Sequence, residues 1–219
     1  MSRYSLAVFD VDGTLLDTTN GVLSSVKYTI EQFGFEMLPQ DKLLDFIGPP
    51  IQDSFANAYG LSGDILQKIA TVFRNRYKTA DLLNAVPYSG IFDLFDQLSR
   101  SGVRPAVATY KREDYAITLL RHFGFDRYTS IMFGGDHENK LKKCDIIKKC
   151  IDAAGIDDIS KVIMIGDTLN DAVGAKNLGI DFAAVTYGFG FKTRQELDSI
   201  NKKCIAHSVG DLSVFFKEN

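Results

Sequence analysis

Two short acidic segments of the chain contain the residue types from which a reactive site could be built. The first is Asp10-Val11-Asp12-Gly13-Thr14-Leu15. In an extended strand Asp10 and Asp12 point the same way, so their carboxylates repel unless a cation or a shared proton relieves them. Gly13 permits a tight turn and exposes backbone N–H groups that can hold an anion. The alternative interpretation is an ordinary Asx turn after a strand.

The second acidic segment follows the apolar residues 162–165. It is Gly166-Asp167-Thr168-Leu169-Asn170-Asp171. Asp167 and Asp171 are four residues apart where a helix is predicted to begin, a spacing that can place both on one face. Helix capping explains one acid at such a position but not both. Two acid pairs at the ends of two strands predict a cluster of four carboxylates, and oxygen ligands of this kind favour Mg²⁺.

The elements that must position these acids follow an alternating pattern. Apolar runs typical of strands buried on both faces cover residues 6–9, 106–108, 131–133, 162–165 and 182–185. Segments with helical periodicity cover residues 90–101, 112–123, 145–154 and 170–178, and several end at a glycine. This alternation predicts an α/β fold with a doubly wound, Rossmann-like parallel sheet. Ligands of such sheets bind beyond the carboxyl ends of the strands, where both acidic segments lie.

A helical block interrupts this alternation and predicts an inserted domain. Between residues 18 and 83 no strand pattern occurs, and amphipathic helices are predicted at 21–33, 41–46, 52–59 and 63–79. We therefore expect an α/β core domain formed by residues 1–16 and 84–219, with a helical cap domain over residues 17–83. Late in the cap, Arg74, Arg76, Tyr77 and Lys78 could reach a substrate anion or form a solvated helix face.

The composition excludes several classes of protein. The chain has 219 residues, of which 45% are hydrophobic and 24% charged, as in ordinary globular proteins and unlike long disordered chains. A net charge of −3 gives no reason to expect a nucleic acid polymer or an anionic membrane as partner. Its three cysteines form no metal-binding or disulfide pattern. We expect a cytoplasmic protein that is a monomer or a weak dimer.

The motifs resemble those of the haloacid dehalogenase-like (HAD) hydrolase superfamily. The two acidic segments look like its first and fourth motifs, and Thr109-Tyr110-Lys111, after the strand at 104–108, is similar to its second. The resemblance covers essentially the whole chain, including the helical insertion. Residues 17–22 and 47–51 look most like the phosphoglycolate phosphatase branch and its nucleotide 5′-phosphatase relatives.

The resemblance implies roles for the acidic residues. Asp10 would be the nucleophile, and Asp12 would protonate the leaving oxygen and then activate water. Mg²⁺ would be held by Asp10, the backbone carbonyl of Asp12 and Asp167, with Asp171 orienting its water ligands.

The resemblance also implies a phosphate-binding set. Gly13, Thr109, Tyr110 and a lysine would hold the phosphate oxygens. The family expects this lysine before the helix that precedes the fourth-motif strand. Lys143 is favoured there, with Lys142 and Lys140 as alternatives. Lys111 could also reach the phosphate or lie on the surface.

The implied function is Mg²⁺-dependent hydrolysis of a small phosphomonoester, of the phosphoglycolate or nucleoside 5′-monophosphate type, through an aspartyl-phosphate. Dehalogenases of the superfamily lack the second aspartate, so Asp12 indicates phosphate ester chemistry. One alternative is a sugar phosphomutase, which the absence of histidine between residues 17 and 83 disfavours. Another is a non-catalytic binding module, which the complete set of acids disfavours.

Overall fold

The computed structural model describes residues 2–138, 140–191 and 193–219. The chain divides into two compact units. The core unit comprises Met1–Asp17 and Pro87–Asn219, and the cap unit comprises Thr18–Val86. Two short strands, β2 (Leu16–Asp17) and β3 (Val86–Pro87), pair where the chain passes from one unit to the other.

The core unit is built on a parallel sheet with the strand order β5-β4-β1-β6-β7-β8. The strands are β1 (Leu6–Phe9), β4 (Arg104–Arg112), β5 (Met132–Gly135), β6 (Val162–Gly166), β7 (Asp181–Val185) and β8 (Cys204–Ala206). Their order reverses at β1, which lies between β4 and β6, and ligands of doubly wound sheets bind beyond the carboxyl ends of the strands at such a reversal. The predicted doubly wound α/β fold is confirmed.

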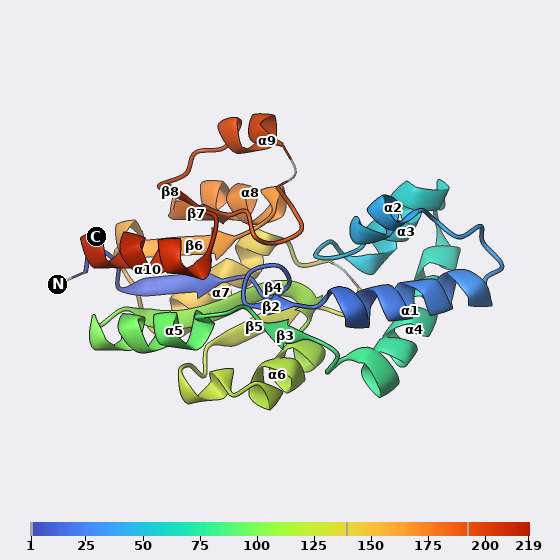
Figure 1. Cartoon of the computed structure of the whole chain (residues 1–219), viewed down its shortest axis with the longest axis horizontal. Helices are drawn as coiled ribbons and strands as arrows, with labels where there is room; N and C mark the ends of the chain where they lie inside the picture. Colours follow the sequence, from blue (N-terminus) through green and yellow to red (C-terminus); the bar gives the residue numbers. More distant parts are fainter. Residues whose placement is uncertain (1, 139, 192) are drawn as a thin grey trace. The chain divides into compact units, whose positions relative to one another are not determined.

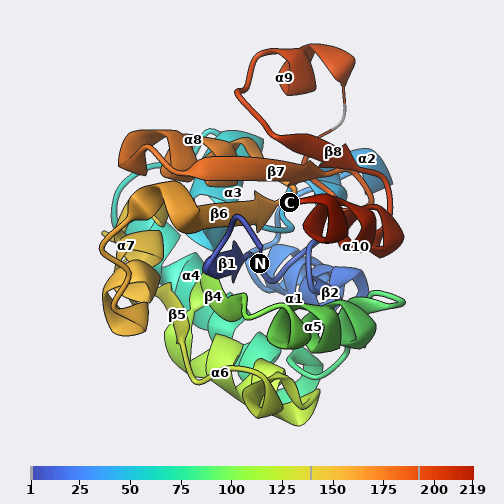
Figure 2. The same cartoon turned by 90° about the vertical axis from the view of Figure 1, so that its left-hand side faces the viewer.

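Helices cover both faces of this sheet. In Figures 1 and 2, α7 and α8 lie on one face, and α5 and α10 lie on the other. The helices of the unit are α5 (Ile91–Arg100), α6 (Glu113–His122), α7 (Lys143–Ala154), α8 (Leu169–Leu178), α9 (Arg194–Asp198) and α10 (Val209–Glu218). Helix α7 contacts β4, β5 and β1, whereas α8 contacts β6 and β7.

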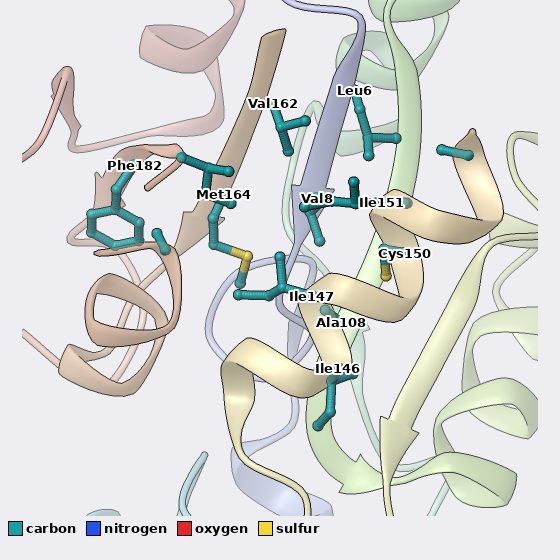
Figure 3. Close-up of a cluster of buried hydrophobic side chains, with 14 of the residues drawn as sticks. Leu6, Val8, Ala108, Ile146, Ile147, Cys150, Ile151, Val162, Met164 and Phe182 are labelled. Atoms are coloured by element: carbon teal, nitrogen blue, oxygen red, sulfur yellow. The ribbon is translucent and has the colours of Figure 1, made fainter. Parts of the chain in front are cut away.

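The core under α7 fixes the two strands that precede the acidic segments. Figure 3 shows Ile147 of α7 lying between side chains of β1 and β6, including Val8 and Met164. These side chains are fully buried, and each such burial stabilises the fold by about 1.5–3 kcal/mol. The register places Phe9 beside Ile165, so the residues that follow the two strands begin side by side.

The regular structure of the cap unit is helical, apart from Val86 at the beginning of β3. It contains α1 (Thr19–Gln32), α2 (Gln40–Leu44), α3 (Ile51–Tyr59), α4 (Asp64–Arg76) and a π-helical turn, η1 (Tyr77–Asp81). Arg74 is buried and donates to Gln52, and Arg76 pairs with Asp81 at 3.0 Å. These two arginines therefore have partners inside the cap unit.

In the part of the chain that the structure describes, none of the helices combines the length and the apolar character that a membrane crossing requires.

Candidate active site

Asp10 lies at the centre of the sheet because β1 is paired on both sides. Its backbone N–H donates to the Ile165 carbonyl at 3.0 Å, and its side chain is buried. The chain then turns at Gly13, whose φ of 77° is in the left-handed region that favours glycine. A Cβ at Gly13 would also collide with the Asp167 carboxylate, so this glycine lets the β1 loop approach the β6 loop.

Asp171 is both a helix cap and a member of the acidic site. Thr168 is the N-cap of α8, and Asp171 Oδ2 accepts from the Thr168 hydroxyl at 2.6 Å and from its N–H at 3.1 Å. The capping interpretation is therefore right for this residue. Gly166 permits the arrangement, because a Cβ there would collide with the Asp171 carboxylate.

Three carboxylates meet at the ends of β1 and β6. One oxygen from each of Asp10, Asp167 and Asp171 lies within 4.8 Å of the others, and all three residues are buried. The carboxylate of Asp12 is outside this group and pairs with Lys111 at 3.1 Å. Among the described residues, the expected cluster of four side chains is thus a cluster of three, because the turn after Asp10 directs Asp12 toward β4.

The oxygen atoms of this cluster suit a hard divalent cation. Asp167 Oδ2 accepts from the N–H groups of Phe189 at 2.7 Å and Gly190 at 3.0 Å. Asp167 Oδ1 is buried and has no hydrogen-bond partner among the residues that the structure describes. A buried carboxylate oxygen left in this state is destabilising unless a cation or proton satisfies it. The donor set is all oxygen, as Mg²⁺ prefers.

Lys143 supplies the positive charge of the site. It is the first residue of α7, and its Nζ lies 2.7 Å from Asp10 Oδ1 and 2.7 Å from Asp171 Oδ1. Lys142, the N-cap of α7, is exposed, and exposed Lys140 pairs with Glu138. Of the three candidate lysines, Lys143 is the one that the fold brings to the carboxylates.

The electrostatics of the cluster show an excess of negative charge. Burial raises the pKa of Asp10 to about 7, although Lys143 opposes the shift, and Asp171 and Asp12 add to it. Burial also raises the pKa of Asp167 well above its ordinary value, with repulsion from Asp171 and Asp10 adding to the effect. Burial alone would lower the pKa of Lys143, but attraction to Asp10 and Asp171 outweighs it and the pKa rises.

The residues of the second motif lie inside a strand, which corrects one expectation. A strand ending at residue 108 was expected, but β4 continues to Arg112, with a register shift against β5 between Ala108 and Arg112. Thr109 is buried, and its hydroxyl accepts from the N–H of Lys111 at 3.1 Å. The Tyr110 hydroxyl accepts from the backbone N–H of Lys143 at 3.0 Å, so Tyr110 holds the beginning of α7.

The loop after β7 contacts the acidic site and was not predicted from the sequence. Its residues Phe189 and Gly190 donate to Asp167, and Tyr187 donates to the Thr14 carbonyl at 3.0 Å. A Cβ at Gly190 would meet the backbone of Asp167, so a small residue is required there. The available signal was the Gly188-Phe189-Gly190-Phe191 run directly after a buried strand.

Comparisons with known proteins agree with this geometry. The model of the haloacid dehalogenase-like hydrolase family matches residues 7–185. A 5′-nucleotidase from Pseudomonas aeruginosa is 31% identical over 189 residues, covering 86% of this chain and 85% of that protein. A phosphoglycolate phosphatase from Agrobacterium fabrum is 32% identical over 191 residues, covering 84% and 81%. The crystal structure of a predicted phosphatase from Clostridium acetobutylicum matches with a TM-score of 0.91, 30% identity and 99% coverage of both chains.

Proposed function

The chain belongs to the haloacid dehalogenase-like hydrolase family and is a phosphatase of that family, and from this premise we propose that it hydrolyses a small phosphomonoester through a phosphorylated Asp10. The observation that carries the proposal is the buried group of Asp10, Asp167 and Asp171, in which Asp10 and Asp171 pair with the ammonium of Lys143. In this arrangement Asp10 can act as the nucleophile. Asp167 and Asp171 can help to hold a cation, and Lys143 can bind the phosphate.

The metal requirement of the proposal rests on the oxygen donors. Asp10 and Asp167 would hold Mg²⁺ together with the backbone carbonyl of Asp12, and Asp171 would orient the water ligands. When bound, the ion would offset the repulsion between a carboxylate nucleophile and an anionic phosphate. The unpartnered Oδ1 of Asp167 supports this assignment.

In the first step, an oxygen of Asp10 forms a bond to phosphorus while the bond from phosphorus to the leaving oxygen breaks. Asp12 gives a proton to that oxygen, so the product leaves as a neutral alcohol. Asp12 suits this role because it lies two residues from the nucleophile and its carboxylate is outside the three-carboxylate cluster.

In the second step, water attacks the phosphorus of the aspartyl-phosphate and transfers a proton to Asp12, which restores the Asp10 carboxylate and releases phosphate. The Thr109 hydroxyl and the Lys143 ammonium would bind the non-bridging oxygens throughout. The Gly13 N–H, which was expected to join them, donates instead to the Leu16 carbonyl at 3.0 Å. Tyr110 would contribute by holding the backbone of Lys143, to which it is hydrogen-bonded.

The substrate class that we propose is a small metabolite of the phosphoglycolate or nucleoside 5′-monophosphate type. The relative at 31% identity is named a 5′-nucleotidase and the relative at 32% identity a phosphoglycolate phosphatase. Both names support this substrate class, and neither selects one substrate within it.

The test is a screen of phosphorylated metabolites with the full-length protein, in Mg²⁺ and in excess EDTA, ranked by kcat/KM. We expect phosphate release that requires Mg²⁺ and is abolished by Asp10→Asn. The matched control is Asp157→Asn, which changes an exposed acid outside the site. Normal turnover by Asp10→Asn would refute the covalent route. Asp12→Asn should slow both the phosphorylation of Asp10 and the breakdown of the aspartyl-phosphate, because a proton passes through Asp12 in each step.

A further inference from the structure

A cavity of the core unit lies against the outer side of α8. Its volume is about 550 Å³, within the range of cavities that hold small organic ligands. We call it the α8 groove. Its walls come from α8, from the beginning of β7 and from residues 199–203, which precede β8. Figure 2 shows α8 lying beside β7, with the segment that carries α9 above them.

The α8 groove has an apolar floor and an apolar wall. Ala172, Ile180 and Phe182 are buried and line its base. On the wall, Leu169 is 41% exposed and Val173 is 51% exposed, which are high values for large apolar side chains. These two residues are four apart on one helix and are therefore neighbours, so together they form a continuous apolar strip.

The charged lining of the α8 groove is mostly cationic. Lys176, Lys202 and Lys203 line it, with Asp181 as the single carboxylate. Asp181 is already neutralised by Arg3 at 3.0 Å and Lys203 at 3.4 Å. Lys202 is held by backbone carbonyls of residues 197 and 200, which leave its charge uncompensated. Lys176 is exposed and makes no ion pair within the described part of the chain.

The α8 groove is separate from the active site, although both use α8. Asp171 and Gly174 lie on the side of the helix that meets Lys143 of α7. Leu169, Val173 and Lys176 lie on the side that lines the groove. The phosphatase chemistry uses no residue of the groove, so the groove has no role in the reaction proposed above.

We propose that the α8 groove is a binding site for a small amphiphilic organic anion, with an aromatic or branched aliphatic body and one carboxylate or sulfonate. The body would lie along Leu169, Val173 and Phe182. The anionic group would lie between Lys176 and Lys202, neither of which pairs with a carboxylate among the residues that the structure describes. The cavity volume, the apolar strip and the charge complementarity together specify this ligand class.

The test uses 1-anilinonaphthalene-8-sulfonate as the probe, titrated by fluorescence into the full-length protein. We expect one saturable site. Val173→Glu places a negative charge in the apolar strip, and it should weaken binding at least about tenfold. Lys176→Ala, which only removes a charge from an exposed position, should weaken binding several-fold. Val214→Glu is the matched control, because Val214 is 53% exposed on α10 and outside the groove.

Two further measurements make the proposal falsifiable. Uncharged N-phenyl-1-naphthylamine has the same ring system without the sulfonate and should bind at least about tenfold more weakly; equal affinity would refute an anion site. Amide chemical shifts should change around Val173 and residues 200–203. Shifts centred instead on the cap-unit cavity lined by Lys42, Phe46 and Asn57, or unchanged binding by Val173→Glu, would overturn the proposal.

Discussion

Asp167→Asn should stabilise the metal-free protein while removing its response to Mg²⁺. In the wild type, Asp167 Oδ2 accepts two backbone hydrogen bonds and Oδ1 accepts none, although both oxygens are buried beside the carboxylates of Asp10 and Asp171. An asparagine keeps the accepting oxygen for the Phe189 and Gly190 N–H groups. Its NH₂ group takes the place of Oδ1 and can donate to the neighbouring carboxylates.

The size of the expected stabilisation follows from the cost of leaving the buried Oδ1 of Asp167 without a hydrogen-bond partner among the described residues. A buried polar atom without a partner costs about 1–3 kcal/mol, and more when it is charged. In a chain of this size, each kcal/mol shifts Tm by about 2–4 °C. We therefore expect Asp167→Asn to raise Tm by about 2–10 °C in EDTA near neutral pH. In the wild type, Mg²⁺ at a hundred times its Kd should add about 2.7 kcal/mol of stability, and in the variant it should add little.

The pH dependence has a definite sign. Burial raises the pKa of Asp167, so above the unfolded-state pKa of about 3.9 the folded protein retains a proton that the unfolded chain has lost. The free energy of unfolding of the wild type therefore falls as pH rises from that value toward the folded pKa. Asparagine does not titrate, so the advantage of the variant should be absent near pH 3 and grow as pH rises toward the folded-state pKa of Asp167.

The assay is thermal unfolding by circular dichroism at several pH values, in EDTA and in Mg²⁺, with Asp157→Asn as the surface control. A lower Tm for Asp167→Asn in EDTA at neutral pH would refute the idea that the carboxylate is unsatisfied. A Mg²⁺ response equal to that of the wild type would refute its assignment as a metal ligand.

Other predictions concern the contacts that surround the cluster. Lys143→Met should lower the free energy of unfolding in urea by about 3–5 kcal/mol, because it leaves buried carboxylates without their cation. Lys140→Met, at an exposed position, should change it by less than about 0.5 kcal/mol, and similar losses for both would contradict the role of the buried ammonium. Gly190→Ala should lower kcat/KM at least about tenfold, since its Cβ would collide with the backbone of Asp167 and displace a group that chemistry requires within a fraction of an ångström. Steady-state kinetics would check this against Gly210→Ala on α10, where a Cβ has room, and an unchanged kcat/KM would count against the loop contact.

The sequence contained enough information for the sheet and for the helices next to it. The buried strands at Leu6–Phe9 and Val162–Gly166 are short apolar runs with polar ends, and α7 and α8 end at the glycines 155 and 179, so local signals and fold agree. The elements after residue 186 were not predicted. Strand β8 has three residues, of which one is buried, too few to establish a period. Helix α10 does carry a signal, the Ser208 and Asp211 capping box.

The candidate site, too, could be predicted from the sequence only in part. The acids could be predicted to lie together because parallel strands end at one edge of the sheet. Their individual partners could not, since these depend on how loops fold back. The pairing of Asp12 with Lys111 arises from the continuation of β4, and the hydrogen bonds to Asp167 come from residues 189 and 190, more than twenty positions along the chain.

Asp171 both caps α8 and pairs with Lys143, and these two roles limit the residue types that could replace it in any descendant of this chain. Serine or threonine could still begin the helix but would bring no charge to Lys143. Glutamate would keep the charge, but its longer side chain would not fit the tight space against Gly166. Asparagine keeps the side-chain length of aspartate and an oxygen that can accept from Thr168, while discarding the charge. It is therefore the replacement that would separate damage to folding from damage to chemistry.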